Sequence, residues 1–300
     1  MTVRVGVCGT AHWAGLVHLP GHRANADVEL VGVHGRGAER RDALAAEFGI
    51  RGFERFEDML DAVDAVSFVV PPAAQASLAI QAVRAGKHVL LEKPLAPDVP
   101  AARELVAAID AAGVASLCFL TRMFIAEARA FLDGIRAAGP TTGKAVFHSQ
   151  ALLSGPYAGS AWRQEEHGAL RDAAPHGMSM LVSALGPLVE VSASGSARDG
   201  YLMNYRHESG ALSSQELNLS KAGVDLFERY EFETAEGIMA QPGFDYDRPS
   251  TFASASREFT NRIATGDRDA PEIRLALHLQ DVIAAAEKSL ATGTPGAVAS

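Results

Sequence analysis

A glutamate and a lysine, Glu92 and Lys93, follow a short apolar run in the segment between Gly86 and Pro94. The run is typical of a buried strand in a parallel sheet, and Pro94 ends it. Ligands of open α/β sheets bind beyond the carboxyl ends of the strands, so a lysine there can orient and polarise a substrate oxygen. Taken alone, the two charged residues are more typical of a solvated strand end. The other motifs of the chain decide between that interpretation and a ligand site.

A second pair of reactive side chains, Asp172 and His176, lies four residues apart. On a helix this spacing brings both side chains to one face, where the carboxylate could orient the imidazole for proton transfer. The alternative is a helix start, with Asp172 as the N-cap and Pro175 in the first turn.

The turn after the first predicted strand reads Gly9-Thr10-Ala11-His12-Trp13-Ala14. A dinucleotide site needs small residues there, so that backbone N–H groups and a helix N-terminus reach the pyrophosphate. Only the first glycine of the usual Gly-x-Gly-x-x-Gly pattern is present, but its position between strand and helix favours cofactor binding. The alternative is a tight turn that no longer holds a nucleotide.

The end of the second predicted strand bears on which cofactor binds. An NAD site usually has an acidic residue there for the ribose 2′-hydroxyl, whereas this chain has His34, Gly35 and Arg36, followed by Arg40 and Arg41. Guanidinium groups suit a 2′-phosphate, so we expect NADP(H) rather than NAD(H), which stays possible. The alternative is that the three arginines form the solvated face of a surface helix.

The elements that must position these residues alternate between strand and helix in the first third of the chain. Repeated β-α-β units predict an α/β fold, with a doubly wound parallel sheet of the Rossmann type. The predicted strands are Val3–Cys8, Val28–Val33, Ala65–Val70, the run before Glu92, and Val114–Leu120, and the predicted helices are Ala38–Phe48, Phe56–Leu60, Gln75–Ala85 and Asp98–Ala112.

The pattern changes after Leu120, where strands follow one another with short turns. Such a succession predicts a second, α+β domain with an open, largely antiparallel sheet, so we divide the chain into residues 1–120 and 121–300. The predicted helices are Ile125–Ala138, Pro175–Leu185, Phe252–Ile263 and Ile273–Leu290, and the predicted strands are Lys144–Leu152, Val189–Ser194, Tyr201–His207, Ala211–Leu219 and Phe227–Thr234.

Composition narrows the classes of function. With 300 residues, 48% of them hydrophobic and 21% charged, the chain is long enough for two globular domains. A net charge of −9 argues against nucleic acid or an anionic membrane as the main partner. No apolar run approaches a membrane span, and no secretory signal precedes the first strand, so we expect a cytoplasmic protein.

Other catalytic chemistries find little support in the sequence. Cys8 and Cys118, the only cysteines, lie in apolar runs and are expected to be reduced core residues. The ten histidines show no recurring ligand spacing, which argues against a metal site. No nucleophile-elbow pattern appears, which argues against a Ser-His-Asp hydrolase.

With these motifs in place, the chain resembles the Gfo/Idh/MocA family of NAD(P)-dependent oxidoreductases, named for glucose–fructose oxidoreductase and inositol dehydrogenase. The chain departs from the family at Gln75, where histidine is frequent, and in a turn that is poorer in glycine. The similarity runs in family order through the N-terminal strand and turn, Val69–Pro72, Ala85–Leu95, Leu120–Arg122, Ala161–Arg163 and Leu170–His176.

The resemblance implies roles for individual residues. Lys93 matches the family's active-site lysine and would stabilise a developing alkoxide, while Asp172 and His176 match its Asp-x-x-x-His pair, with His176 as general base or acid. The expected cofactor contacts are Gly9, Thr10, Ala11, His12, Trp13, Arg36, Arg40, Pro71, Pro72, Gln75, Glu92 and Lys93, and the expected substrate contacts are Arg122, Trp162 and Arg163.

The resemblance also implies a sugar, polyol or related small hydroxy or keto compound as substrate, with the cofactor between the two domains. The alternative is a catalytically inactive regulatory or sensor protein that binds NAD(P) on the same scaffold. The segment Ser154–Ser160 is rich in glycine and serine and is a candidate mobile lid.

The predicted second sheet also suggests how the protein assembles. We expect apolar side chains on both of its faces, with Tyr201, Met203 and Tyr205 sharing one side of their strand, and Tyr230 and Phe232 sharing a side of theirs. One face would pack on helices. The other would meet a second subunit in a homodimer or homotetramer.

Overall fold

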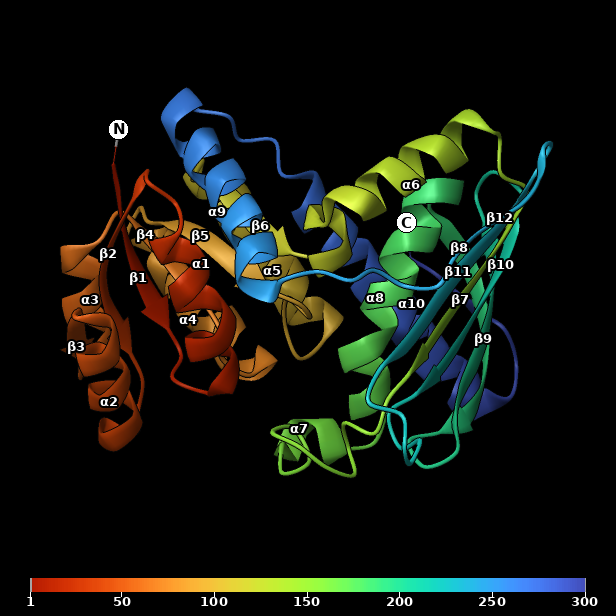
Figure 1. Ribbon diagram of the computed structural model, residues 1–300, viewed down its shortest axis with the longest axis horizontal. Helices are drawn as coiled ribbons and strands as arrows, with labels where there is room; N and C mark the ends of the chain where they lie inside the picture. The colour runs from red at the N-terminus through yellow and green to blue at the C-terminus, as the bar shows by residue number, and fades with distance from the viewer. Residues whose placement is uncertain (1, 300) are drawn as a thin grey trace. The chain divides into compact units, whose positions relative to one another are not determined.

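The first third of the chain builds a six-stranded, all-parallel sheet in the computed structural model, which describes residues 2–299 (Figure 1). The strand order is β3-β2-β1-β4-β5-β6. From β1 the chain first adds strands on one side and then, from β4 on, on the other side, which confirms the doubly wound topology. The strands are β1 (Val3–Cys8), β2 (Val28–His34), β3 (Arg51–Phe53), β4 (Ala65–Phe68), β5 (His88–Glu92) and β6 (Ser116–Phe119).

Helices connect these strands, and local sequence explains where two of them end and where one of those two begins. Gly49 and Gly113, both at a φ of 60°, close α2 and α5 in the left-handed conformation that glycine adopts without strain. At the start of α5, the carboxylate of Asp98 accepts a hydrogen bond of 2.9 Å from the amide of Ala101. The helices are η1 (Ala14–His18), α1 (Leu19–Arg23), α2 (Ala38–Phe48), α3 (Phe56–Ala62), α4 (Pro72–Arg84) and α5 (Val99–Ala112).

The packing divides the described chain into two units, residues 2–124 with 246–277, and residues 125–245 with 278–299. The first unit therefore includes η2 (Thr121–Phe124) and α9 (Arg248–Thr265), although the sequence places α9 in the second domain. The fully buried side chains of Phe252 and Phe259 join the core of the first sheet, and this burial ties α9 to that unit.

The second unit contains a seven-stranded mixed sheet with the order β12-β11-β7-β10-β9-β8-β13. Only the β7–β10 pair is parallel, which confirms the largely antiparallel sheet. The strands are β7 (Thr142–His148), β8 (Leu188–Ser196), β9 (Gly200–His207), β10 (Leu212–Asn218), β11 (Phe227–Thr234), β12 (Gly237–Gln241) and β13 (Gly296–Ala297). The helices are α6 (Ala126–Ala137), α7 (Ala161–Gln164), α8 (Gly168–Leu185) and α10 (Pro271–Thr292), the last of which belongs to this unit from residue 278 on.

Helix α8 covers one face of this sheet, as its contacts with β7, β9 and β10 show (Figure 1). The two apolar groups named from the sequence are both buried. The exposed side chains of Leu202, Leu212 and Phe227 alternate with the buried ones along their strands, so apolar side chains do occur on both faces of the sheet, as expected. A homo-oligomer through the uncovered face stays a prediction. The buried set is Tyr201, Met203, Tyr205, Tyr230 and Phe232.

A histidine is fully buried where α1 packs on α9. The Ser256 hydroxyl accepts a hydrogen bond from Asn25 at 3.0 Å and forms a second one, of 2.9 Å, with Nδ1 of His22. The ring of Phe252 packs edge-on against the imidazole. Burial, with a smaller contribution from the nearby His18, lowers the pKa of His22 to about 3.

His22 should therefore destabilise the fold in acid. Below pH 6.5 the unfolded chain binds a proton at this residue that the folded chain rejects, so stability present above pH 6.5 is lost as the pH falls toward 3. Between pH 7 and pH 5 we expect wild type to lose about 2 kcal/mol more unfolding free energy than His22→Asn. Urea unfolding followed by the emission of Trp13, in a Trp162→Phe background, measures this difference. Equal losses in the two proteins would contradict it.

Candidate active site

A cavity of about 860 Å³ opens at the carboxyl ends of β1, β2 and β4 in the first unit. This volume lies in the range of small-molecule and cofactor sites, and the place is the switch point of the sheet. Six of the predicted cofactor residues line it: Gly9, Thr10, Ala11, Arg36, Arg40 and Pro71. The other lining residues were not among the predicted cofactor contacts, and they include His34, Gly35, Gly37 and Ser77.

At two positions in the cavity wall, Gly9 and Gly35, no larger residue fits. Gly9 has a φ of 133°, and a Cβ there would lie 2.3 Å from the carbonyl oxygen of Val69. A Cβ on Gly35 would lie 2.5 Å from the side chain of Thr10. The methyl group of Ala14, which replaces the third glycine of the usual pattern, is instead fully buried in the core. The residues present therefore fit the backbone cradle of a dinucleotide.

Two of the three candidate arginines line the cavity. Arg36 and Arg40 do so together with Ser77, whereas the guanidinium of Arg41 donates to Asp42 at 2.8 Å. His34, at the end of β2, donates through Nδ1 to the carbonyl of Phe53 at 3.0 Å. Two arginines and one acidic residue, Glu39, thus line the cavity just beyond the strand end where an NAD site usually has an acid.

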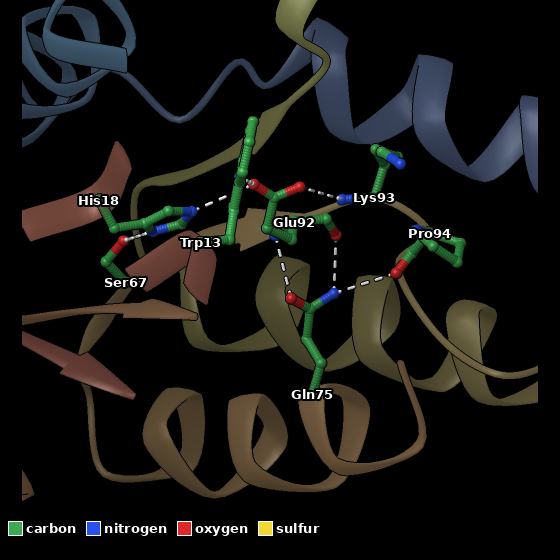
Figure 2. A network of polar contacts seen from close by, with 7 residues as sticks. All are labelled: Trp13, His18, Ser67, Gln75, Glu92, Lys93 and Pro94. Carbon is green, nitrogen blue, oxygen red and sulfur yellow. Dashed lines mark hydrogen bonds and ion pairs between the residues drawn. The ribbon is translucent and has the colours of Figure 1, made fainter. Parts of the chain in front are cut away.

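Glu92 and Lys93 lie at the end of β5, in a polar network of the first unit (Figure 2). One carboxylate oxygen of Glu92 accepts a hydrogen bond from the indole of Trp13 at 3.0 Å and contacts Nε2 of His18 at 3.1 Å. The other accepts from the amide of Lys93 at 3.2 Å. The side chain of Lys93 extends away from this carboxylate (Figure 2). The network therefore fixes the lysine through its backbone.

Gln75 holds the same loop from below, with an exposed fraction of 1%. Its side-chain nitrogen donates to the carbonyls of Glu92, Pro94 and Leu95 at 2.7, 3.1 and 3.1 Å, and its oxygen accepts from the amide of Glu92 at 2.9 Å. Gln75, predicted as a cofactor contact, is in the structure a support for the lysine loop.

Trp13 and His18 reach the same oxygen because η1 is a π-helix. In an α-helix, residues five apart point roughly 140° away from each other. The amide of Leu19 donates to the carbonyl of Ala14, and this i→i+5 hydrogen bond widens the turn. No pattern in the sequence indicated His18 as part of the site.

In the second unit, Asp172 pairs with an arginine that the sequence assigned to substrate. Arg163 donates to the two carboxylate oxygens at 2.7 and 3.3 Å, and both side chains are largely buried. The guanidinium also lies 4.6 Å from the ring centre of Tyr157 and 4.4 Å from that of Trp162. Arg163 thus compensates the charge of Asp172 at this site.

Asp172 and His176 both lie inside α8, which begins at Gly168 with His167 as its N-cap. The helix-start alternative for Asp172 is therefore wrong, and Pro175 is tolerated as the eighth residue of the helix. Since the two residues are four apart on one helix, they share a face. The imidazole of His176 stacks on the ring of Phe147 at 5.4 Å, a contact that orients it and that the sequence did not indicate.

The remaining site residues are divided between the units. Arg122 is buried in the first, with its guanidinium 5.8 Å from the ring centre of Tyr246, and Trp162 lies in α7 of the second. His12, Trp13 and Pro72 do not line the cavity. The candidate lid, Ser154–Ser160, consists mainly of turns and bends, and its mobility stays a prediction.

The two cysteines are buried, and neither forms a disulfide. Burial raises the pKa of Cys8 to about 12. Burial, followed by the negative charge of Glu92, also raises the pKa of Cys118. Both are neutral thiols at physiological pH, which argues against a cysteine nucleophile. Among residues 2–299, no cluster of three or more histidine, cysteine or acidic side chains is placed to hold a metal ion.

The support of the lysine loop can be tested at Gln75. Gln75→Leu would leave three carbonyls and one amide without their partner, so we expect it to lower the unfolding free energy by about 2–4 kcal/mol. The control is Gln81→Leu, at an exposed position of the same helix, where we expect less than about 0.5 kcal/mol. Urea unfolding measures both. Equal effects would show that the hydrogen bonds of Gln75 contribute little.

Comparisons with known proteins agree with this geometry. UDP-N-acetylglucosamine 3-dehydrogenase of Acidithiobacillus ferrooxidans is 38% identical over 104 residues, or 35% of this chain and 32% of that protein. Galactose 1-dehydrogenase of Pseudomonas fluorescens is 32% identical over 133 residues, or 43% of this chain and 41% of that protein. The chain thus matches well under half the length of either relative.

The fold also matches solved structures over its whole length. GenD2 from gentamicin A biosynthesis, in complex with NAD, has a TM-score of 0.87 at 20% identity, over 100% of this chain and 97% of that one. Among the described residues, no helix is both long and apolar enough to span a bilayer. The profile of the oxidoreductase family with an NAD-binding Rossmann fold matches residues 3–119. Residues 3–119, which include all six strands of the parallel sheet, thus match the Gfo/Idh/MocA oxidoreductases.

Proposed function

We propose that this protein is an NAD(P)-dependent oxidoreductase that interconverts a hydroxyl and a keto group on a sugar, a polyol or a related small compound. The observation that carries the proposal is the first unit's combination of a dinucleotide-sized cavity with a lysine fixed at a neighbouring strand end. The similarity to sugar dehydrogenases supports the choice of substrate class.

In this proposal the nicotinamide, when bound, would accept or give the hydride. Lys93 is the cation that stabilises the negative charge developing on the reacting oxygen, which is why its backbone has to be held rigidly. His176 takes the hydroxyl proton during oxidation and returns it during reduction. Phe147 keeps the imidazole plane oriented, and Asp172, whose charge Arg163 compensates, lies on the same helical face.

Within this function we favour NADP(H) over NAD(H). Arg36 and Arg40 line the cavity at the end of β2, where a 2′-phosphate would need cationic donors. NAD(H) stays open as the second cofactor, because a structural neighbour was solved with NAD.

The alternative function is a regulatory or sensor protein that binds NAD(P) without turnover. The Asp172–His176 pair distinguishes the two functions, since a sensor has no use for a histidine that an aromatic ring orients on the same helical face as a charge-compensated aspartate. The presence of Lys93, Asp172 and His176 together favours the enzyme.

Replacement of the proposed catalytic groups tests the function. We expect Lys93→Met and His176→Asn to lower kcat/KM by about 10²–10⁴-fold, while the dissociation constant of the cofactor changes only a few-fold. The assay follows the reduction of NADP⁺ or NAD⁺ at 340 nm with a panel of sugars and polyols. The matched control is Lys144→Met, which removes an exposed lysine of the second sheet. If both variants turn over a substrate of wild type as fast as wild type does, the assignment is wrong.

The cofactor preference rests on the two cavity arginines. Arg36→Ala combined with Arg40→Ala should weaken NADPH binding by about 10- to 100-fold, because two charge-assisted contacts to the 2′-phosphate are lost. NADH, which has no such phosphate, should bind with nearly unchanged affinity. Calorimetric titration of both cofactors measures the two effects, and equal losses for NADPH and NADH would contradict a 2′-phosphate site. Arg41→Ala is the control, since that guanidinium pairs with Asp42.

A further inference from the structure

Three groups of the first unit meet at the carboxylate of Glu92 (Figure 2). Trp13 follows the turn whose residues Thr10 and Ala11 line the cavity, and His18 ends the π-helix after it. Lys93 is the third donor, through its backbone amide. The carboxylate is 13% exposed, so it lies apart from bulk solvent.

The direction of these hydrogen bonds follows from the chemistry of the groups. An indole N–H and a backbone N–H can only donate, so the side-chain oxygens of Glu92 accept from both Trp13 and Lys93. His18 can donate to Glu92 whether or not its ring is charged, because its other nitrogen faces the hydroxyl of Ser67 at 3.0 Å. A hydroxyl both donates and accepts, so the contact persists in either state of the imidazole.

We propose that Glu92 is a positioning residue that couples occupation of the phosphate-binding turn to the alignment of Lys93. One of its oxygens is held by Trp13 and His18, and the other holds the amide of the lysine. This inference rests on the proposed function, in which Lys93 meets the reacting oxygen.

The coupling follows from the position of Trp13 between cavity and carboxylate. A ligand that orders Thr10 and Ala11 restrains the backbone two residues before Trp13, and hence the indole that fixes the first oxygen of Glu92. Gln75 already holds the carbonyls of Glu92, Pro94 and Leu95. The Lys93 amide is therefore the part of the loop whose position depends on the carboxylate.

The test follows the Lys93 amide in solution by NMR of the full chain labelled with ¹⁵N-lysine. The chain has five lysines, so the spectrum has few resonances, and Lys93→Met assigns the one required. The probes are ADP-ribose and its 2′-phosphate, which occupy a dinucleotide site without a nicotinamide ring next to the lysine. In wild type we expect saturating probe to shift the Lys93 amide resonance.

Trp13→Phe keeps an aromatic ring but removes the donor, so the Lys93 shift should be lost while the probe still binds. Glu92→Gln should have the same effect, and His18→Gln, which keeps a donor, should preserve the shift. Trp162→Phe is the matched control and should leave the Lys93 response intact. With a substrate, Trp13→Phe should lower kcat by about 10-fold or more and leave the cofactor dissociation constant within a few-fold.

An unchanged Lys93 response in both Trp13→Phe and Glu92→Gln would overturn the coupling. Unchanged resonances of the other four lysines verify that each variant is folded. The proposed function fails separately, if Lys93→Met keeps full turnover, because the amide response of wild type does not depend on the lysine side chain.

Discussion

A buried polar group without a partner costs free energy, and this cost governs the end of strand β5. Carbonyls and amides of the lysine loop leave the sheet there and lose its regular hydrogen bonds. The side chains of Gln75 and Glu92 replace them, one from below the loop and one from its own strand end. Because both side chains are themselves largely buried, their hydrogen bonds leave the loop few alternative conformations. A lysine held through its backbone in this way is suited to stabilise charge at a fixed point.

In the second unit, an ion pair stabilises the largely buried carboxylate of Asp172. A carboxylate inside α8 would be costly without a cation, and Arg163 provides one in a two-point contact. The Arg163 guanidinium also packs against the rings of Trp162 and Tyr157. The ion pair with Asp172 therefore links the segment before α8 to the helix. His176 is then oriented by packing on Phe147.

Local signals predicted much of the fold. The end of α2 and both ends of α5 follow from Gly49, Asp98 and Gly113, whose backbone and capping preferences act within one turn. The strand before Glu92 and the turn at Gly9 also lie where the apolar pattern indicated. The sequence also predicted Arg36 and Arg40 as cofactor contacts, and both line the cavity.

Contacts distant in the sequence were not predictable in this way. Alternation within a strand shows that Tyr201 and Met203 share a side, but only strand pairing decides that Tyr230 lies on the same face. The apolar stripe of α9 does not specify which sheet covers it. In an ordinary α-helix the side chains of Trp13 and His18 would point in different directions. The π-helix lets both of them reach Glu92.

The most direct test of this account is the binding of nicotinamide cofactors to the wild-type chain, followed by the emission of Trp13 in a Trp162→Phe background. Trp13 adjoins the turn that lines the cavity, so we predict that NADPH quenches it with a lower dissociation constant than NADH. Absence of binding by either cofactor would contradict the account, because a chain with no affinity for a nicotinamide dinucleotide is not the proposed oxidoreductase.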